Sequence, residues 1–187
     1  MARTPSNMLA LGTKAPNFRL YDTASHRMLT LAELKGKAGT VVMFICNHCP
    51  FVIHVNDQLV KTANAYQAKG IQFIAISSND VINYPQDGPE KMIEQVKKLN
   101  YPFPYLYDET QQVAKSYDAA CTPDLYLFNE NLELVYRGQL DGSRPGNDIP
   151  VTGEDLHYAM DCLLSGKEND RSQMPSIGCN IKWKVSN

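Results

Sequence analysis

The sequence predicts an α/β fold in which a central mixed β-sheet is covered by helices on both faces. Two apolar, β-branched runs, residues 40–45 and 71–77, are typical of strands buried inside a sheet. Between them, apolar residues recur every three or four positions, as on one face of a helix. Further along, two strand-like runs separated by the turn residues 129–131 predict a hairpin. This alternation of strands and helices is what the architecture requires.

The N-terminal half opens with a predicted hairpin. Residues 15–22 and 26–31 flank a turn-like TAS segment, and Thr30 is a suitable cap for one helical turn. After the first buried strand, we expect a long helix that begins near Asn47 and stops at Gly70. The apolar face of this helix is formed by Val52, Val55, Leu59, Ala63 and Tyr66.

The second half continues the alternation. After a loop of turn-forming residues, residues 91–100 show the apolar face of a helix, and residues 153–166 show another. The apolar residues of the segment 167–187 recur with no clear period, so we expect an extension wrapped on the surface. Between the two helices we expect, in order, a strand over 103–108, a short helix over 109–118 and hairpin strands over 121–129 and 130–138.

Composition indicates one globular domain over residues 1–187, with its core at about 10–166. Apolar residues make up 43% of the chain and charged residues 20%. The net charge is −2 and basic residues form no block, which gives no reason to expect a nucleic acid or an anionic membrane as partner. No apolar run has the length of a signal peptide or a membrane span, so we expect a cytoplasmic protein.

The motif CNHCP, residues 46–50, joins the first buried strand to the long helix. The amino end of a helix has unpaired N–H groups and a partial positive charge, which lower the pKa of a nearby thiol. We therefore expect Cys46 at the cap, exposed and reactive, and Cys49 one turn on and more buried. Cys46 would open a disulfide and Cys49 would resolve it. Pro50 is tolerated in a first helical turn.

The two residues between the cysteines are expected to tune the pair. Asn47 and His48 stand there, and a protonated imidazole would stabilise a nearby thiolate. This would shift the couple toward a better oxidant. Alternatively, His48 is a histidine on the helix surface with no influence on the thiols.

Three motifs in this order resemble the thioredoxin fold, and more closely its redoxin branch of AhpC/TSA-type peroxiredoxins and TlpA-like thiol-disulfide proteins. The motifs are CNHCP, the CTPD of residues 121–124 before a strand, and the segment FPYLYDETQQVAKSYD of residues 103–118. The resemblance covers residues 10–166 in element order. It implies thiol–disulfide exchange, with a redox-active Cys46–Cys49 disulfide and no other cofactor. The implied partners are a protein or small-molecule disulfide and a thiol reductant.

The resemblance also gives Thr122 and Pro123 a role. In such proteins the proline is cis and lies against the cysteine pair, and the backbone of the preceding residue pairs with an extended substrate. Sequence alone favours a trans bond, since only about 5–6% of X–Pro bonds in folded proteins are cis. Pro123 stands ahead of a strand in a chain that also carries CxxC, and this position favours the cis interpretation.

Three alternatives remain open. A thiol peroxidase of the peroxiredoxin kind would carry a threonine and a proline in fixed positions before its cysteine, and that pattern is missing here. A copper or zinc carrier could use CNHC with His48 and His54, as Sco-type redoxins bind copper, although those cysteines are spaced three apart and no second CxxC completes a zinc site. The third is an interaction module without redox activity.

The other three cysteines each have two interpretations. Cys179 is either a third thiol that the extension returns to the site or a structural cysteine near Trp183. Cys121, two residues before the proline, is an alternative disulfide partner or a buried residue. Cys162 is a packing residue or a surface thiol.

Overall fold

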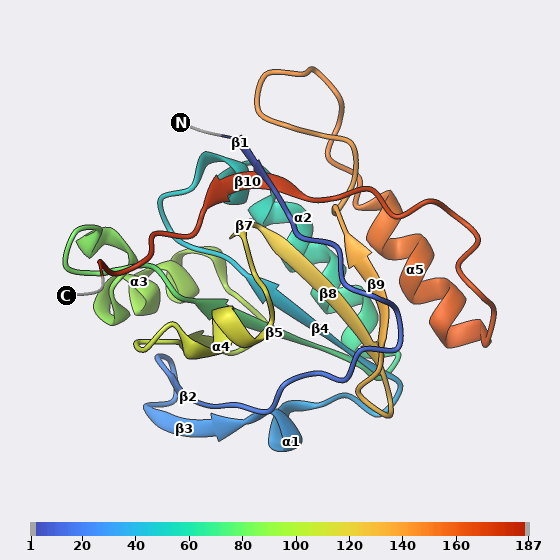
Figure 1. The fold of residues 1–187 in the computed structure, drawn as a ribbon, viewed down its shortest axis with the longest axis horizontal. Helices are drawn as coiled ribbons and strands as arrows, with labels where there is room; N and C mark the ends of the chain where they lie inside the picture. Colours follow the sequence, from blue (N-terminus) through green and yellow to red (C-terminus); the bar gives the residue numbers. More distant parts are fainter. Residues whose placement is uncertain (1–2, 186–187) are drawn as a thin grey trace.

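The computed structural model of the chain describes residues 3–185 and is built around a seven-stranded mixed sheet (Figure 1). In sheet order its strands are β3 (Arg27–Thr30), β2 (Arg19–Asp22), β6 (Tyr105–Tyr107), β5 (Ile71–Ser77), β4 (Gly39–Phe44), β8 (Asp124–Asn129) and β9 (Leu134–Gly138). β4 and β6 each pair in parallel with β5, and the other neighbours are antiparallel. The predicted central mixed sheet is confirmed.

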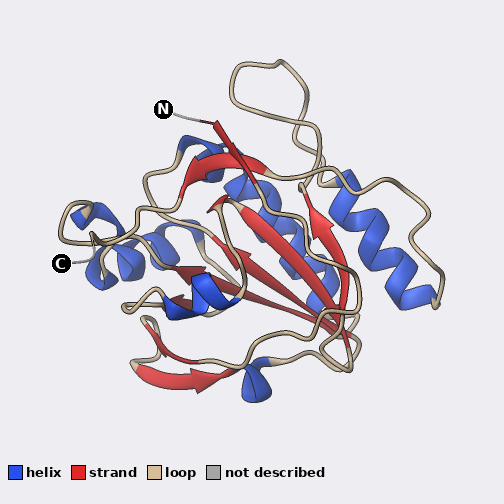
Figure 2. Cartoon of the chain, viewed as in Figure 1, coloured by secondary structure: helices blue, strands red, loops and turns tan. Residues whose placement is uncertain are grey.

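Helices cover both faces of this sheet, as the sequence predicts (Figure 2). They are α1 (Leu31–Leu34), α2 (Pro50–Gln67), α3 (Pro89–Leu99), α4 (Gln112–Ser116) and α5 (Glu154–Ser165), with a 3₁₀ turn η1 (Pro85–Asp87). Apolar residues of α2, α3 and α5 form one core with one face of the sheet. Those of α4 and the N-terminal segment form a second core on the other face. Within residues 3–185, none of these helices has the length and apolar content that crossing a bilayer requires.

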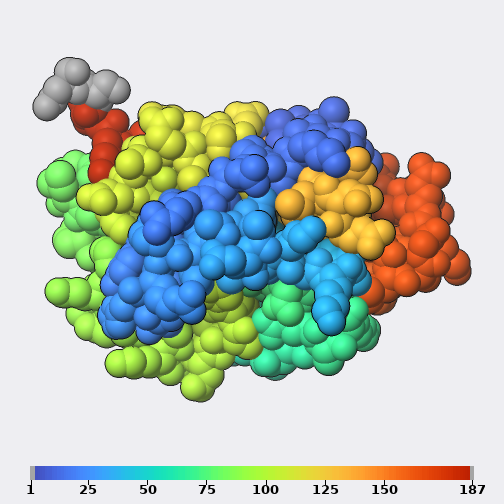
Figure 3. Space-filling model, turned by 90° about the horizontal axis from the view of Figure 1, so that it is seen from below, coloured from blue at the N-terminus to red at the C-terminus, as the bar shows by residue number. Residues whose placement is uncertain are grey.

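The N-terminal hairpin is present at the edge of the large sheet, where β2 and β3 pair antiparallel. Thr30 caps α1 in a capping box with Glu33, which confirms its predicted capping role. Seen from below, the N-terminal segments form a continuous blue band across this side of the molecule (Figure 3). They therefore cover the second core.

The C-terminal extension differs from the prediction. Residues 177–180 form strand β10 (Ile177–Asn180), which pairs antiparallel with β1 (Arg3–Pro5) on one side and β7 (Cys121–Thr122) on the other. The chain returns to cross above β7 (Figure 1). Cys179 and Ile181 are buried, so this part of the extension is an internal strand rather than a surface wrapping. A strand of four residues is too short to show a hydrophobic period, so it could not be recognised from the pattern.

Candidate dithiol site

The two sequence motifs meet at the junction between β4 and α2. The Thr122–Pro123 peptide bond is cis, as the resemblance implies. The Cys49 thiol donates a hydrogen bond to the Thr122 carbonyl oxygen at 3.1 Å, across 73 residues of sequence. The Cys46 sulfur lies 3.5 Å from the Thr122 hydroxyl oxygen. The fold therefore places both thiols against the residue that precedes the cis proline.

The start of α2 differs from the prediction and changes where the two cysteines lie relative to the helix. The helix begins at Pro50, so Cys49 is its N-cap and Cys46 lies before it in a non-helical turn. Cys46 is 2% exposed and Cys49 is fully buried, so the predicted exposure of Cys46 is wrong. The helix starts three residues later than expected because the amides at positions 47 and 48 are bound by a side chain from another loop. Pro50 occupies the first helical turn, as predicted.

Within the pair, Cys49 is the cysteine whose pKa is lowered. A hydrogen bond from Cys46 lowers the pKa of Cys49 to about 5, although burial acts in the opposite direction. Thr122 and Cys179 lower it further through their own hydrogen bonds. The same bond to Cys49, together with burial and the charge of Asp87, raises the pKa of Cys46. The direction of the pKa shift at Cys46 is opposite to the expected lowering, because Cys46 hydrogen-bonds to Cys49, is buried and lies near the charge of Asp87.

Asp87 organises the turn between the cysteines and was not found in the sequence analysis. It is fully buried at the end of η1. Its Oδ1 accepts hydrogen bonds from the backbone N–H groups of Asn47 (2.8 Å) and His48 (3.3 Å). Its Oδ2 lies 2.6 Å from the His48 Nδ1 and accepts from Asn79 Nδ2 at 2.8 Å. One buried carboxylate thus fixes the backbone and the imidazole of the CNHC turn.

A signal for Asp87 was present in the sequence. The segment YPQDGPE places an acidic residue among turn formers, in the loop after β5. β4 and β5 are parallel neighbours, so their carboxyl ends lie at the same edge of the sheet. A loop after one strand can therefore contact the turn after the other. The turn formers of this segment predict only a loop, and the contact of Asp87 with the CNHC turn adds its function.

The Asn47 side chain binds η1 and β6 and makes no hydrogen bond to either sulfur. Its side-chain amide donates to the Gln86 carbonyl oxygen at 2.8 Å, and its Oδ1 accepts from the Tyr105 hydroxyl at 3.2 Å. The first contact joins the CNHC turn to η1 and the second joins it to β6. Asn47 therefore holds the turn in place, and the predicted tuning of the thiols through it would be indirect.

His48 lies close enough to affect Cys46. Its Nδ1 is 3.9 Å from the Cys46 sulfur, and its ring stacks on Tyr84 with centroids 5.5 Å apart and an interplanar angle of 11°. The imidazole is thus held between Asp87 and the thiol by ring stacking and a short hydrogen bond. Its side chain is only partly exposed, which differs from a histidine pointing into water.

Within residues 3–185, Cys46, His48 and Asp87 form a group that could hold a metal ion, since their ligand atoms all lie within 4.8 Å of one another. His54, the other histidine considered from the sequence, instead lies 2.7 Å from the Ser143 hydroxyl. A cation bound at the His48 Nδ1 would have to displace its 2.6 Å contact with Asp87. The donor set suits a borderline metal such as zinc.

Replacing Asp87 by asparagine should destabilise the protein and loosen this turn. Each charge-assisted hydrogen bond that is lost should cost about 1.5–3 kcal/mol of unfolding free energy. Removing the carboxylate also removes a charge that raises the pKa of Cys46, so that pKa should fall. Urea unfolding and thiolate absorbance against pH measure the two effects. Glu90→Gln, on the exposed start of α3, is the control. An unchanged Cys46 titration in Asp87→Asn would contradict the assigned electrostatic role.

Of the remaining cysteines, Cys179 reaches the site and Cys121 lies next to it. Cys179 hydrogen-bonds to Cys49. The Cys121 sulfur instead lies 3.6 Å from the Pro123 carbonyl oxygen, and burial raises its pKa. Cys121 is thus a buried neighbour of the pair.

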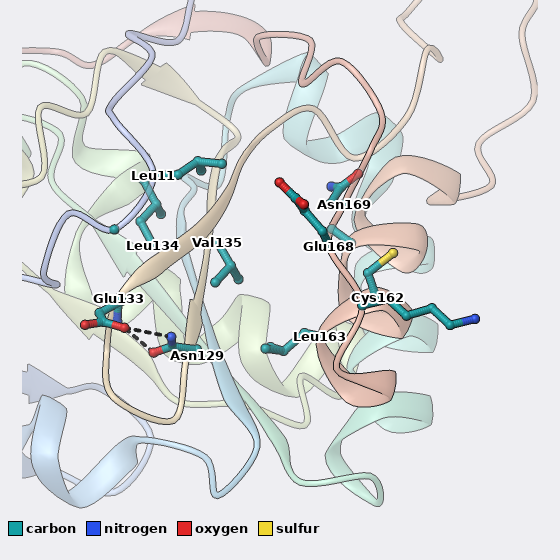
Figure 4. Close-up of a pocket in the computed structure, with 12 residues that line it drawn as sticks. Leu11, Asn129, Glu133, Leu134, Val135, Cys162, Leu163, Glu168 and Asn169 are labelled. Atoms are coloured by element: carbon teal, nitrogen blue, oxygen red, sulfur yellow. Dashed lines mark hydrogen bonds between the residues drawn. The ribbon is translucent and has the colours of Figure 1, made fainter.

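Cys162 belongs to a different place in the fold. It lines a pocket between the β8–β9 hairpin and α5, where Leu11, Leu134 and Val135 face Cys162, Leu163 and Glu168 (Figure 4). Neither Cys46 nor Cys49 lines this pocket. The pocket is therefore separate from the dithiol site, and Cys162 is a buried packing residue.

Comparison with known proteins identifies relatives of the whole chain. The model of the Redoxin family matches residues 10–156. The crystal structure of an uncharacterized conserved protein from Geobacillus kaustophilus is 56% identical, with a TM-score of 0.98, over 100% of this chain and 99% of that one. That of a hypothetical protein from Sinorhizobium meliloti is 46% identical, with a TM-score of 0.95, over 98% and 100%. No curated protein matched.

More distant structures share the fold. The thioredoxin domain of a thiol-disulfide oxidoreductase from Bacteroides vulgatus is 19% identical, with a TM-score of 0.65, over 84% of this chain and 99% of that one. At this identity the match shows only that the two proteins share a fold. The fold of this chain is thioredoxin-like.

Proposed function

Because the chain belongs to the Redoxin family, we propose that it is a thiol–disulfide oxidoreductase whose redox group is the Cys46–Cys49 pair. The observation that carries the proposal is the convergence of both sulfurs on Thr122, beside a cis proline and at the N-terminus of an 18-residue helix. A helix terminus and hydrogen-bond donors stabilise a thiolate, which is the nucleophile of disulfide exchange.

The lowered pKa assigns the first attack to Cys49. Its thiolate attacks one sulfur of a substrate disulfide, a mixed disulfide forms, and the first substrate thiolate leaves with a proton from solvent. Cys46 then loses its proton and attacks the Cys49 sulfur. The second substrate thiolate leaves and takes up that proton, and the Cys46–Cys49 disulfide forms. A thiol reductant restores the pair. Both sulfurs are covered, so the substrate sulfur must displace the segments above them.

Insulin reduction with dithiothreitol as the electron source tests this proposal. We expect the wild-type protein to accelerate the precipitation of reduced insulin. After oxidation with diamide, the tryptic peptide of residues 38–61, which contains both cysteines, should have lost two hydrogens. If insulin is reduced no faster than by dithiothreitol alone, and this peptide keeps two thiols, the proposal is wrong.

A metal carrier is the second candidate, favoured by the cluster of Cys46, His48 and Asp87. Elemental analysis of the purified protein separates the two. Stoichiometric copper or zinc that is lost in His48→Ala would support the carrier. Insulin reduction that survives a strong chelator would support the oxidoreductase. Consumption of hydrogen peroxide with a thiol reductant tests the peroxidase alternative, and the cytoplasmic location stays a prediction.

A further inference from the structure

Cys49 is close to two other thiols. Hydrogen bonds from Cys46 and from Cys179 both lower its pKa. These two cysteines are far apart in the sequence, since Cys46 follows β4 and Cys179 lies in β10. A mixed disulfide formed on Cys49 would therefore have two neighbouring thiols that could attack it.

Backbone pairing fixes the position of Cys179. In the register of β10 with β7, Cys179 lies opposite Thr122, the residue whose carbonyl oxygen accepts from the Cys49 thiol at 3.1 Å. The preceding residue is Gly178, where a Cβ would overlap that same carbonyl oxygen. The absence of a side chain at this position lets β10 lie directly against the loop of the cis proline.

The segment after β10 is also held. The Lys182 backbone N–H donates to Asn79 Oδ1 at 2.8 Å, and its carbonyl oxygen accepts from the Asp80 N–H at 2.8 Å. The Ile181 N–H donates to the Ala120 carbonyl oxygen at 3.2 Å. Backbone contacts of the residues before and after Cys179 thus fix its position, and the fold itself holds it close to Cys49.

We propose that Cys179 is a second resolving thiol for Cys49, an inference that rests on the proposed function. In the mixed disulfide, the Cys179 thiol loses its proton and its sulfur attacks the Cys49 sulfur. The bond between Cys49 and the substrate sulfur breaks, and the Cys49–Cys179 bond forms. The substrate leaves as a thiolate and takes up the proton. Two protein thiols are oxidised and one substrate disulfide is reduced to two thiols, as in resolution by Cys46.

The two routes leave different products. Resolution by Cys46 joins two cysteines of one turn, whereas resolution by Cys179 joins the N-terminus of α2 to β10 and leaves Cys46 as a thiol beside His48. Burial raises the pKa of Cys179 to about 12, so its attack depends on passing its proton to the leaving substrate. Because the pKa of Cys46 is also raised, both routes need this proton transfer, and the product disulfides distinguish them.

The test uses 5,5′-dithiobis(2-nitrobenzoate), a small disulfide with a coloured leaving thiol, on variants that lack Cys46. In Cys46→Ser we expect loss of the nitrobenzoate adduct from Cys49 and a disulfide between the tryptic peptides 38–61 and 172–182. In Cys46→Ser/Cys179→Ser the adduct should stay on Cys49. Cys46→Ser/Cys162→Ser is the matched control, because Cys162 lies in the separate pocket, and it should behave as Cys46→Ser does.

The outcomes separate the two proposals. An adduct that persists equally in Cys46→Ser and in Cys46→Ser/Cys179→Ser would overturn the resolving role of Cys179 and leave the attack by Cys49 intact. A double variant that never acquires the adduct on Cys49 would overturn the attack itself and, with it, both proposals.

A second variant tests the position of β10 without removing a thiol. Gly178→Ala should displace the strand from the Thr122 carbonyl, so Cys46→Ser/Gly178→Ala should keep the adduct on Cys49. Circular dichroism establishes that the variant is folded. Linkage of peptides 38–61 and 172–182 at the rate of Cys46→Ser would refute placement by β10.

Discussion

Replacing Cys49 by serine is expected to reduce insulin-disulfide reduction to the rate of dithiothreitol alone. Cys49 has the lowered pKa and contacts both other sulfurs, so no other thiol in this site can replace it. Serine is a favoured N-cap residue, and α2 should therefore keep its start at Pro50. The loss would then report chemistry and not unfolding, which a urea titration of the variant can verify.

The control for this substitution is Cys162→Ser, which should retain the wild-type rate because Cys162 lies in the separate pocket on α5. If Cys49→Ser instead accumulates a mixed disulfide on Cys46, the first attack belongs to Cys46 and the assignment of the two roles must be exchanged. Insulin reduction at the wild-type rate by Cys49→Ser would show that the pair is not the redox group.

Replacing Asp124 by asparagine should lower the free energy of unfolding by about 3–5 kcal/mol. Asp124 and Arg137 form an ion pair of 3.1 Å in which both side chains are fully buried. Burial raises the pKa of Asp124 to about 6, against the effect of Arg137, so the carboxylate is charged at neutral pH. An amide at position 124 would leave the guanidinium buried without its counter-ion, and arginine cannot lose its proton in a protein.

The ion pair also supports the dithiol site. Asp124 accepts from the backbone N–H of Ala120, and Arg137 donates to the Asp118 carbonyl oxygen at 2.9 Å, so together they hold the loop that leads to Thr122. Urea unfolding near pH 7.5 measures the loss.

The control for Asp124→Asn is Glu133→Gln, which makes the same chemical change in an exposed pair. Glu133 contacts Lys14 at 3.1 Å, with side chains that are 40% and 65% exposed, and the loss of this pair should cost about 0–1 kcal/mol. Equal effects of the two substitutions would contradict the importance of the buried pair.

Hydrophobic period predicted most of the fold. The run over 40–45 became β4, in which every residue is buried, and the period after it became α2. The β8–β9 hairpin and the strand–helix–strand unit of β4, α2 and β5 also followed from the order of elements. The meeting of CNHCP with a cis proline was implied by the resemblance to the thioredoxin fold. These features depend on local pattern and on connection rules, which a single sequence contains.

The parts that were missed depend on contacts between distant segments. The helix was expected near Asn47, but Asp87 binds the amides of that turn in a non-helical form, and no periodicity records such a contact. The position of Cys49 at the N-cap of α2 was missed for the same reason. β1 and β10 are too short to give a hydrophobic period. β10 pairs with β1 on one side and with β7 on the other, so it joins segments that are far apart in the sequence.

The three-stranded sheet has a consequence for how the protein must be handled. Its strands come from residues 3–5, 121–122 and 177–180, so the surroundings of the sulfurs are complete only when remote parts of the polypeptide have docked. Such non-local pairings form slowly. Chains released from denaturant in air would thus have time to link the wrong sulfurs, and yields of native protein should rise when a reductant is kept in the refolding buffer until docking is finished.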